Sequence, residues 1–190
     1  MKTSTKIFSR RKLTRTFLIS ALISPLIFAG LLPANGSETG YRYWGYFQAP
    51  PNSNSWVMAM TGPTSSVTDG SVEGWIHTFS NEIISAAQPK PLPNFAKLCK
   101  KVKPVADKKR VGLIVDFGTS AIRPKYESLP RRVRTCILIE PNANGAEILA
   151  AATKIRASAS GFICGINGYP AKECSAEMKT PRTLLKNLKK

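Results

Sequence analysis

The sequence predicts an α+β protein, in which an N-terminal antiparallel β-sheet is joined to a second half that mixes strands with a helix. Runs rich in β-branched and aromatic residues fill residues 41–79 and are separated by turn residues. Two apolar runs of strand length follow at 110–118 and 133–140. A helical apolar pattern then precedes a last short apolar run at 161–166. These elements imply one modest core rather than a disordered chain.

Residues 37–80 form the predicted antiparallel region, with strands at 41–48, 55–61 and 72–79. Pro50-Pro51-Asn52, Gly62-Pro63 and Asp69-Gly70 supply the turns. Strand alternation puts Tyr41, Tyr43 and Phe47 on one face and Trp44 and Tyr46 on the other, so we expect both faces to be covered.

The aromatic rings of the first strand are the candidate ligand or partner surface. Flat apolar rings hold ring-bearing ligands and protein surfaces well. The candidates are Tyr41, Tyr43, Trp44 and Tyr46. The alternative interpretation is that these rings only fill the core.

Residues 81–109 read as a connection that contains one short helix. Its apolar residues recur at helical spacing, at Phe95, Leu98, Cys99 and Val102. Asn94 is a suitable N-cap, and Pro104 ends the helix.

Residues 110–178 have the element order of a β-grasp-like unit. Two apolar strands come first, and Asn144 with Glu147 then resembles a capping box for a helix that runs through Ile155. The run at 161–166 supplies the last strand. A β-grasp packs one helix across a mixed sheet, and a split βαβ arrangement would give the same order.

The first 36 residues predict a cleaved signal peptide. Six basic residues and no acid occupy the first sixteen positions, and the apolar run at 17–32 is shorter than the roughly 20 residues that a spanning helix needs. Small residues at Ala34 and Gly36 place the cleavage before Ser37. Residues 9–13 also resemble a twin-arginine signal, so the general secretory and twin-arginine routes both stay open.

Intact mass of the exported protein is therefore expected to show a chain that begins at Ser37. Recovery of the uncleaved chain from the membrane would contradict this prediction.

Four cysteines follow the predicted signal, at Cys99, Cys136, Cys164 and Cys174. An even count in an exported protein predicts disulfides, and four cysteines allow three pairings. We prefer Cys164 with Cys174, across a short loop, and Cys99 with Cys136. A zinc site is the alternative, but the chain has no CxxC and no His close to these cysteines.

The chain is strongly basic, with a formal net charge of +17. Two clusters are candidate contacts to polyanions: Lys100, Lys101, Lys108 and Lys109, and then Arg131, Arg132 and Arg134. Nucleic acid is the usual partner of such charge. Outside the membrane the available polyanions are envelope polymers and anionic lipids, so we expect these and no nucleic acid. A solvated face without a partner is the alternative.

Residues 179–190 predict a basic tail that contains a short helix. Leu184, Leu185 and Leu188 fall on one side of it, among basic residues. Such a segment suits the surface of an anionic membrane, and a frayed tail is the alternative.

The sequence offers no pattern of catalysis. His77 is the only histidine, no GxSxG nucleophile motif occurs, and the eleven acids are scattered. We therefore expect a non-catalytic accessory or binding protein of the cell envelope without metal or cofactor. The alternative is a small secreted hydrolase of envelope polymers, which would require two carboxylates in a pocket or His77 beside an acid and a hydroxyl.

Several ordered pieces, Gly-Tyr-Arg-Tyr-Trp at 40–44 and Cys-Gly-Ile-Asn-Gly-Tyr-Pro at 164–170 among them, resemble an uncharacterised family of small secreted actinobacterial proteins. Residues 144–155 and 162–168 also resemble the transcobalamin-like β-grasp domain. This second resemblance implies service to a micronutrient uptake system, such as an energy-coupling-factor transporter for cobalamin, with a transporter component as partner.

Overall fold

The computed structural model describes residues 38–188. The predicted signal peptide, 1–36, and the cleavage point between Gly36 and Ser37 lie outside the described residues. In chain order the elements are β1 (Thr39–Ala49), β2 (Val57–Met58), β3 (Val72–Ser80), α1 (Phe95–Cys99), β4 (Lys109–Asp116), the 3-10 turn η1 (Ser120–Ile122), β5 (Val133–Ile139), α2 (Gly145–Ala150), β6 (Ile155–Ala157), β7 (Ile163–Ile166), β8 (Ala176–Lys179) and α3 (Arg182–Asn187).

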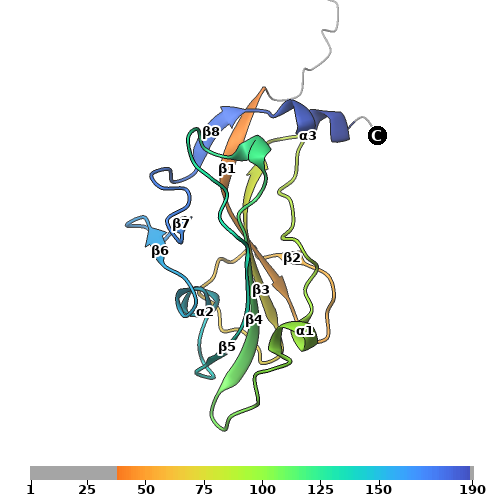
Figure 1. Ribbon diagram of the computed structural model, residues 1–190, viewed down its shortest axis with the longest axis vertical. Helices are drawn as coiled ribbons and strands as arrows, with labels where there is room; N and C mark the ends of the chain where they lie inside the picture. Colours follow the sequence, from red (N-terminus) through yellow and green to blue (C-terminus); the bar gives the residue numbers. More distant parts are fainter. Residues whose placement is uncertain (1–37, 189–190) are drawn as a thin grey trace, which may run out of the picture. The chain divides into compact units, whose positions relative to one another are not determined.

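One mixed sheet forms the centre of the fold, in the order β2-β1-β3-β4-β5 (Figure 1). β1 pairs antiparallel with β2 and β3, which confirms the predicted N-terminal antiparallel arrangement. β3 pairs in parallel with β4, so the strands of both halves of the chain belong to the same sheet. β8 adds to the start of β1, where Thr39 lies opposite Lys179.

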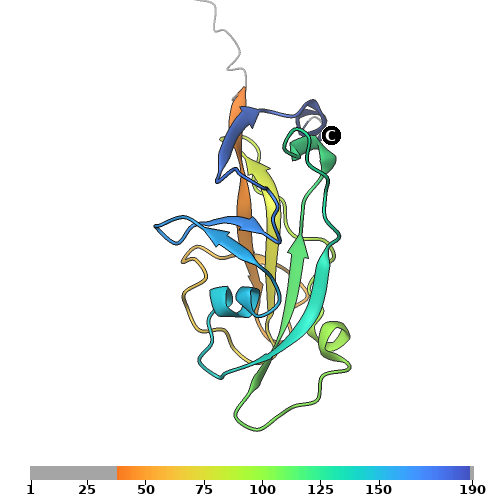
Figure 2. The same ribbon diagram turned by 60° about the vertical axis from the view of Figure 1, so that its left-hand side comes forward.

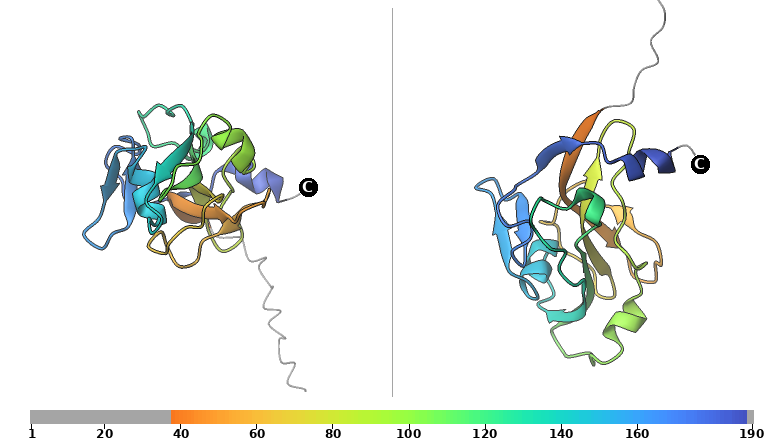
Figure 3. Two further views of the ribbon diagram at one scale, coloured as in Figure 1. Left: turned by 90° about the horizontal axis from the view of Figure 1, so that it is seen from below. Right: turned by 45° about the horizontal axis from the view of Figure 1, so that its top comes forward.

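The last strand of the predicted β-grasp-like unit, 110–178, has a different partner from the one expected. β7 pairs antiparallel with β6, and the two form a separate two-stranded sheet, the hairpin (Figure 3). A β-grasp unit would place this strand within the main sheet. Instead, Ile163 and Ile166 of the hairpin pack against the core of the main sheet. The architecture shown is α+β with one mixed sheet and a hairpin beside it.

Both faces of the main sheet are covered, as strand alternation predicted. On one face, here the hairpin face, Trp44, Tyr46 and Trp75 pack with residues of α2 and the hairpin. On the other, the α1 face, Phe47 and Trp56 pack with residues of α1. Figure 2 shows the hairpin with α2 and, across the sheet from them, α1.

Both predicted disulfide pairings are present. Cys99 with Cys136 ties α1 to β5, and Cys164 with Cys174 ties β7 to the segment before β8. Gly112 lies opposite Cys136 in the β4–β5 ladder. A side chain at this glycine would meet Leu98 at 2.8 Å, so the glycine lets α1 lie close to the sheet.

The predicted basic tail is part of the fold up to residue 188. Leu184 and Leu185 of α3 pack against a small cluster that includes Phe79 and Ile122. The prediction of a leucine side available to a membrane is therefore wrong for these two residues, and Leu188 alone of the three leucines is exposed. Within the described part of the chain, no helix is long and apolar enough to cross a membrane.

Candidate functional site

A cavity of about 710 Å³ opens between the hairpin face of the sheet and the loops beside it. Four stretches of chain line it: part of β1, the loop that follows β2, the start of α2 and the tip of the hairpin. The lining residues are Tyr43, Trp44, Gly45, Tyr46, Met58, Ala59, Thr61, Gly62, Pro63, Thr64, Trp75, Ala146, Ser160, Gly161, Phe162 and Ile163.

Three of the four predicted aromatic candidates, Tyr43, Trp44 and Tyr46, line this cavity. Tyr41 does not line it and is 52% exposed. Tyr46 stacks on Trp75 with ring centroids 4.5 Å apart. The alternative interpretation, that these rings fill the core, also describes Trp44 and Tyr46, because both are buried members of the core cluster. The core and the cavity wall are therefore built from the same rings.

The cavity wall carries no charged residue among those that line it. The two segments that frame the opening, 43–68 and 157–171, contain no Asp, Glu, Lys, Arg or His, although 21% of the chain is charged. The indole N–H groups of Trp44 and Trp75 are buried in the wall and have no partner among the described residues. Such a wall accepts an uncharged apolar molecule and disfavours an ion, because an unpaired ion would lose its hydration there.

Behind Tyr46 lies a buried polar cluster. The Tyr46 hydroxyl donates to the carboxylate of Glu73, and the Gln48 amide donates to the Tyr46 oxygen at 2.8 Å. Glu73 is fully buried, and this burial raises its pKa to about 7. The hydrogen bonds to Glu73 and Gln48 fix the ring of Tyr46 in the cavity wall.

Lys109 belongs to this buried region as well, so its prediction as a polyanion contact is wrong. It is 4% exposed, and its ammonium group donates to the backbone carbonyls of Val67 and Ala143. Burial lowers the pKa of Lys109, and the nearby Glu73 opposes that shift. The Lys109 ammonium group therefore donates hydrogen bonds inside the fold and is not available to a polyanion.

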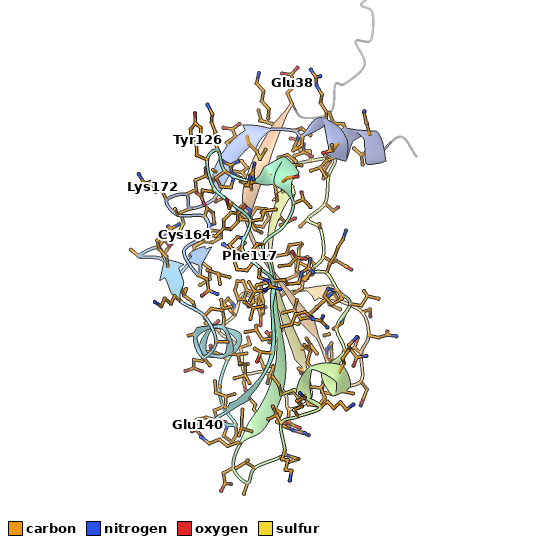
Figure 4. The ribbon with its side chains drawn as sticks, in the orientation of Figure 1. Glu38, Phe117, Tyr126, Glu140, Cys164 and Lys172 are labelled. Carbon is orange, nitrogen blue, oxygen red and sulfur yellow. A yellow bond between two sulfur atoms is a disulfide. The ribbon has the colours of Figure 1, made fainter. Side chains whose placement is uncertain are left out.

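His77 is buried in an aromatic cluster next to the cavity wall. Its ring lies 5.6 Å from that of Trp44 and 5.1 Å from that of Tyr169. Phe117, which Figure 4 labels, contacts both of these neighbours. Burial lowers the pKa of His77 to about 4, with a smaller contribution from Arg42. His77 Nδ1 has no partner in the described part of the chain. At neutral pH this histidine is an uncharged packing residue.

The remaining residues of the two basic clusters lie at the surface: Lys100, Lys101, Lys108, Arg131, Arg132 and Arg134. Lys108 pairs with Glu140, and Arg132 pairs with Asp116 at 3.2 Å.

Among the described residues, no group of three or more His, Cys, Asp or Glu is placed to hold a metal ion. All four cysteines are in disulfides, which removes them as zinc ligands.

Sequence reasoning did not find the residues that complete the cavity, among them Trp75, Ala146 and Phe162. They come from elements far apart in the chain, so no local spacing links them. The lack of charge in segments 43–68 and 157–171 was the one signal that marks both sides of the opening.

The family comparison agrees with the first of the two resemblances seen in the sequence. The family model described as the SCO2322-like domain matches residues 36–179. No curated protein and no solved structure matches the chain. The likeness to transcobalamin-like domains stays a prediction. The chain belongs to the SCO2322-like domain family, an uncharacterised family named after a Streptomyces protein.

Proposed function

We propose that this protein is an exported binding protein of the bacterial cell envelope, and that it holds an uncharged apolar ligand between its sheet and its hairpin. The observation that carries the proposal is the cavity of about 710 Å³, with aromatic walls and no charged lining residue. Small-molecule pockets commonly measure about 300–1,000 Å³ and are mostly apolar, with a few polar groups. Thr61, Thr64 and Ser160 supply such polar groups here.

The surroundings of the cavity support binding over hydrolysis. Glu73 lies behind Tyr46 and is fully buried, and it does not line this cavity. His77 is held neutral among aromatic rings. The hydroxyl groups of the wall therefore have no acid or base beside them among the lining residues. The alternative, a hydrolase of envelope polymers, would have to draw its catalytic groups from elsewhere.

A bulky residue at the start of α2 tests the cavity directly. Ala146 lines the cavity, whereas Ala150 lies on the same helix and is exposed outside it. Ala146→Phe should weaken binding of the neutral fluorescent probe N-phenyl-1-naphthylamine about tenfold or more, because the ring takes the space of the ligand.

The matched variant, Ala150→Phe, should bind the probe like the wild type. Equal probe affinity in the two variants would exclude this cavity as the binding site. Far-UV circular dichroism confirms that both variants are folded.

Cobalamin is the ligand that the β-grasp resemblance suggests, with a transporter component as the partner. A corrinoid is larger than a drug-sized molecule, so this cavity would enclose only part of it. Calorimetric titration of the protein with cobalamin, alongside Tyr43→Ala and Trp44→Ala, tests this form of the proposal. Absence of heat at millimolar cobalamin would remove it and leave smaller apolar ligands.

The exposed arginines before and within β5 support a second, weaker interaction, with anionic polymers or lipids. Replacing Arg131, Arg132 and Arg134 with Gln should lower the affinity for anionic vesicles about a hundredfold at low salt, since each of the three cations near such a surface contributes about 1 kcal/mol. Retention of the wild type should also fall between low and physiological salt.

The control variant replaces three exposed lysines elsewhere, Lys125, Lys154 and Lys172, with Gln, which gives the same change in charge. Equal losses in the two variants would show that only the net charge matters and that the arginine cluster is not a site.

A further inference from the structure

The opening of the cavity has an exposed apolar edge, here the rim, formed by Met58, Met60 and Phe162. Met58 and Phe162 line the cavity and are nevertheless 39% and 42% exposed. Met60 is 87% exposed and sits between Ala59 and Thr61, which both line the cavity. The rim is therefore continuous with the apolar interior.

The rim lies within the two segments that contain no charged residue, 43–68 and 157–171. Solvated loops of a basic protein normally carry charge, yet all eleven acids and all 28 Lys and Arg residues lie elsewhere in the chain. Contiguous exposed apolar side chains that border an apolar opening mark a surface for interaction. The rim is thus suited to contact an apolar surface rather than water.

We propose that the rim docks onto the lipid bilayer and that the cavity takes its ligand, an acyl or isoprenoid chain, from that bilayer. This inference rests on the proposed function. An uncharged apolar ligand is concentrated in a bilayer and scarce in water, so an opening edged with apolar side chains provides a dry path for it. Unbranched methionine side chains and a phenyl ring insert readily at the lipid interface. The excess of basic over acidic residues complements an anionic bilayer.

The test measures binding to vesicles of equal parts phosphatidylcholine and phosphatidylglycerol. Met60→Glu and Phe162→Glu should each lower the vesicle affinity about tenfold or more, because insertion of the apolar side chain is lost. Val105→Glu is the matched control. Val105 lies between α1 and β4, is 49% exposed and does not line the cavity, so the same charge change there should alter affinity by less than about twofold.

Probe binding without vesicles separates this inference from the proposed function. Met60→Glu should retain the affinity of the wild type for N-phenyl-1-naphthylamine, because Met60 does not line the cavity, and this result also shows that the variant is folded. Vesicle affinity equal to that of the wild type in both rim variants, or an equal loss in Val105→Glu, would overturn docking through the rim and leave the ligand proposal intact. If the wild type binds vesicles through the rim but takes up no probe, the proposed function fails instead.

Discussion

Replacing Glu73 with Gln is expected to give a protein whose stability rises steeply between about pH 4 and pH 6.5, by about 3 kcal/mol. The reason is His77, which then dominates the titration of the core. Burial lowers its pKa from 6.5 in the unfolded chain to about 4 in the fold. Its contribution to stability is fully present above pH 6.5 and is lost as the pH falls through about 4, because the unfolded chain binds the proton more readily.

Replacing His77 with Phe is expected to have the opposite effect. Burial raises the pKa of Glu73 from 4.5 to about 7. A carboxyl group whose pKa is raised by folding contributes stability that is fully present below pH 4.5 and is lost as the pH rises through about 7. The variant should therefore lose about 3 kcal/mol over this window.

Urea unfolding at several pH values between 4 and 7.5 measures both effects. In the wild type the two contributions oppose each other in nearly the same window, so the two variants should show slopes of opposite sign on either side of the wild-type slope. Three parallel pH profiles would show that these two groups do not titrate in the fold as their burial implies.

Removal of the Cys99–Cys136 disulfide is expected to be the most destabilising change. The bond closes a loop of 37 residues, and in the chain-entropy model such a loop contributes about 4 kcal/mol. Cys99→Ala with Cys136→Ala should lower the free energy of unfolding by that amount and detach α1 from β5. The Cys164–Cys174 bond closes 10 residues, and its removal should cost about 3 kcal/mol.

Urea unfolding of the two double variants, each compared with the wild type, measures this difference. A smaller loss for the Cys99–Cys136 variant than for the Cys164–Cys174 variant would contradict the account based on loop length. It would also show that the hairpin, rather than α1, depends more on its disulfide.

Local features of the fold were predictable because they depend on residues close in sequence. Asn94 caps α1 through Lys97 N, and Asn144 with Glu147 forms the expected capping box of α2. At the end of β4, the Asp116 carboxylate accepts a hydrogen bond from the backbone N–H of Gly118, two residues further on. Such contacts are fixed by spacing and residue type alone.

The pairing of strands that lie far apart in the sequence was harder to predict. The run at 161–166 has the length and apolar character of a central strand, yet β7 pairs only with β6. Its burial comes from packing against the main sheet rather than from membership in it, and hydrophobicity does not distinguish these two situations. The parallel pairing of β3 with β4 likewise joins segments that no turn connects directly.

Lys109 is a candidate site residue for which the prediction, an exposed polyanion contact, was wrong. Its place in a run of lysines suggested a solvated cluster. In β4, however, Lys109, Val111 and Leu113 occupy every second position. Lys109 therefore faces the same side of the sheet as these two core residues. The position in the strand, and not the charge of neighbouring residues, decides which side the ammonium group faces.

The most direct test of the central claim, a ligand cavity on the hairpin face, uses the three indole N–H signals of the ¹⁵N-labelled protein. Trp44 and Trp75 line the cavity, while Trp56 packs on the α1 face and donates its N–H to the Pro89 carbonyl at 3.1 Å. Titration with N-phenyl-1-naphthylamine should shift the Trp44 and Trp75 signals and leave that of Trp56 in place. Shifts confined to Trp56, or no shift in any of the three at saturating probe, would contradict the account.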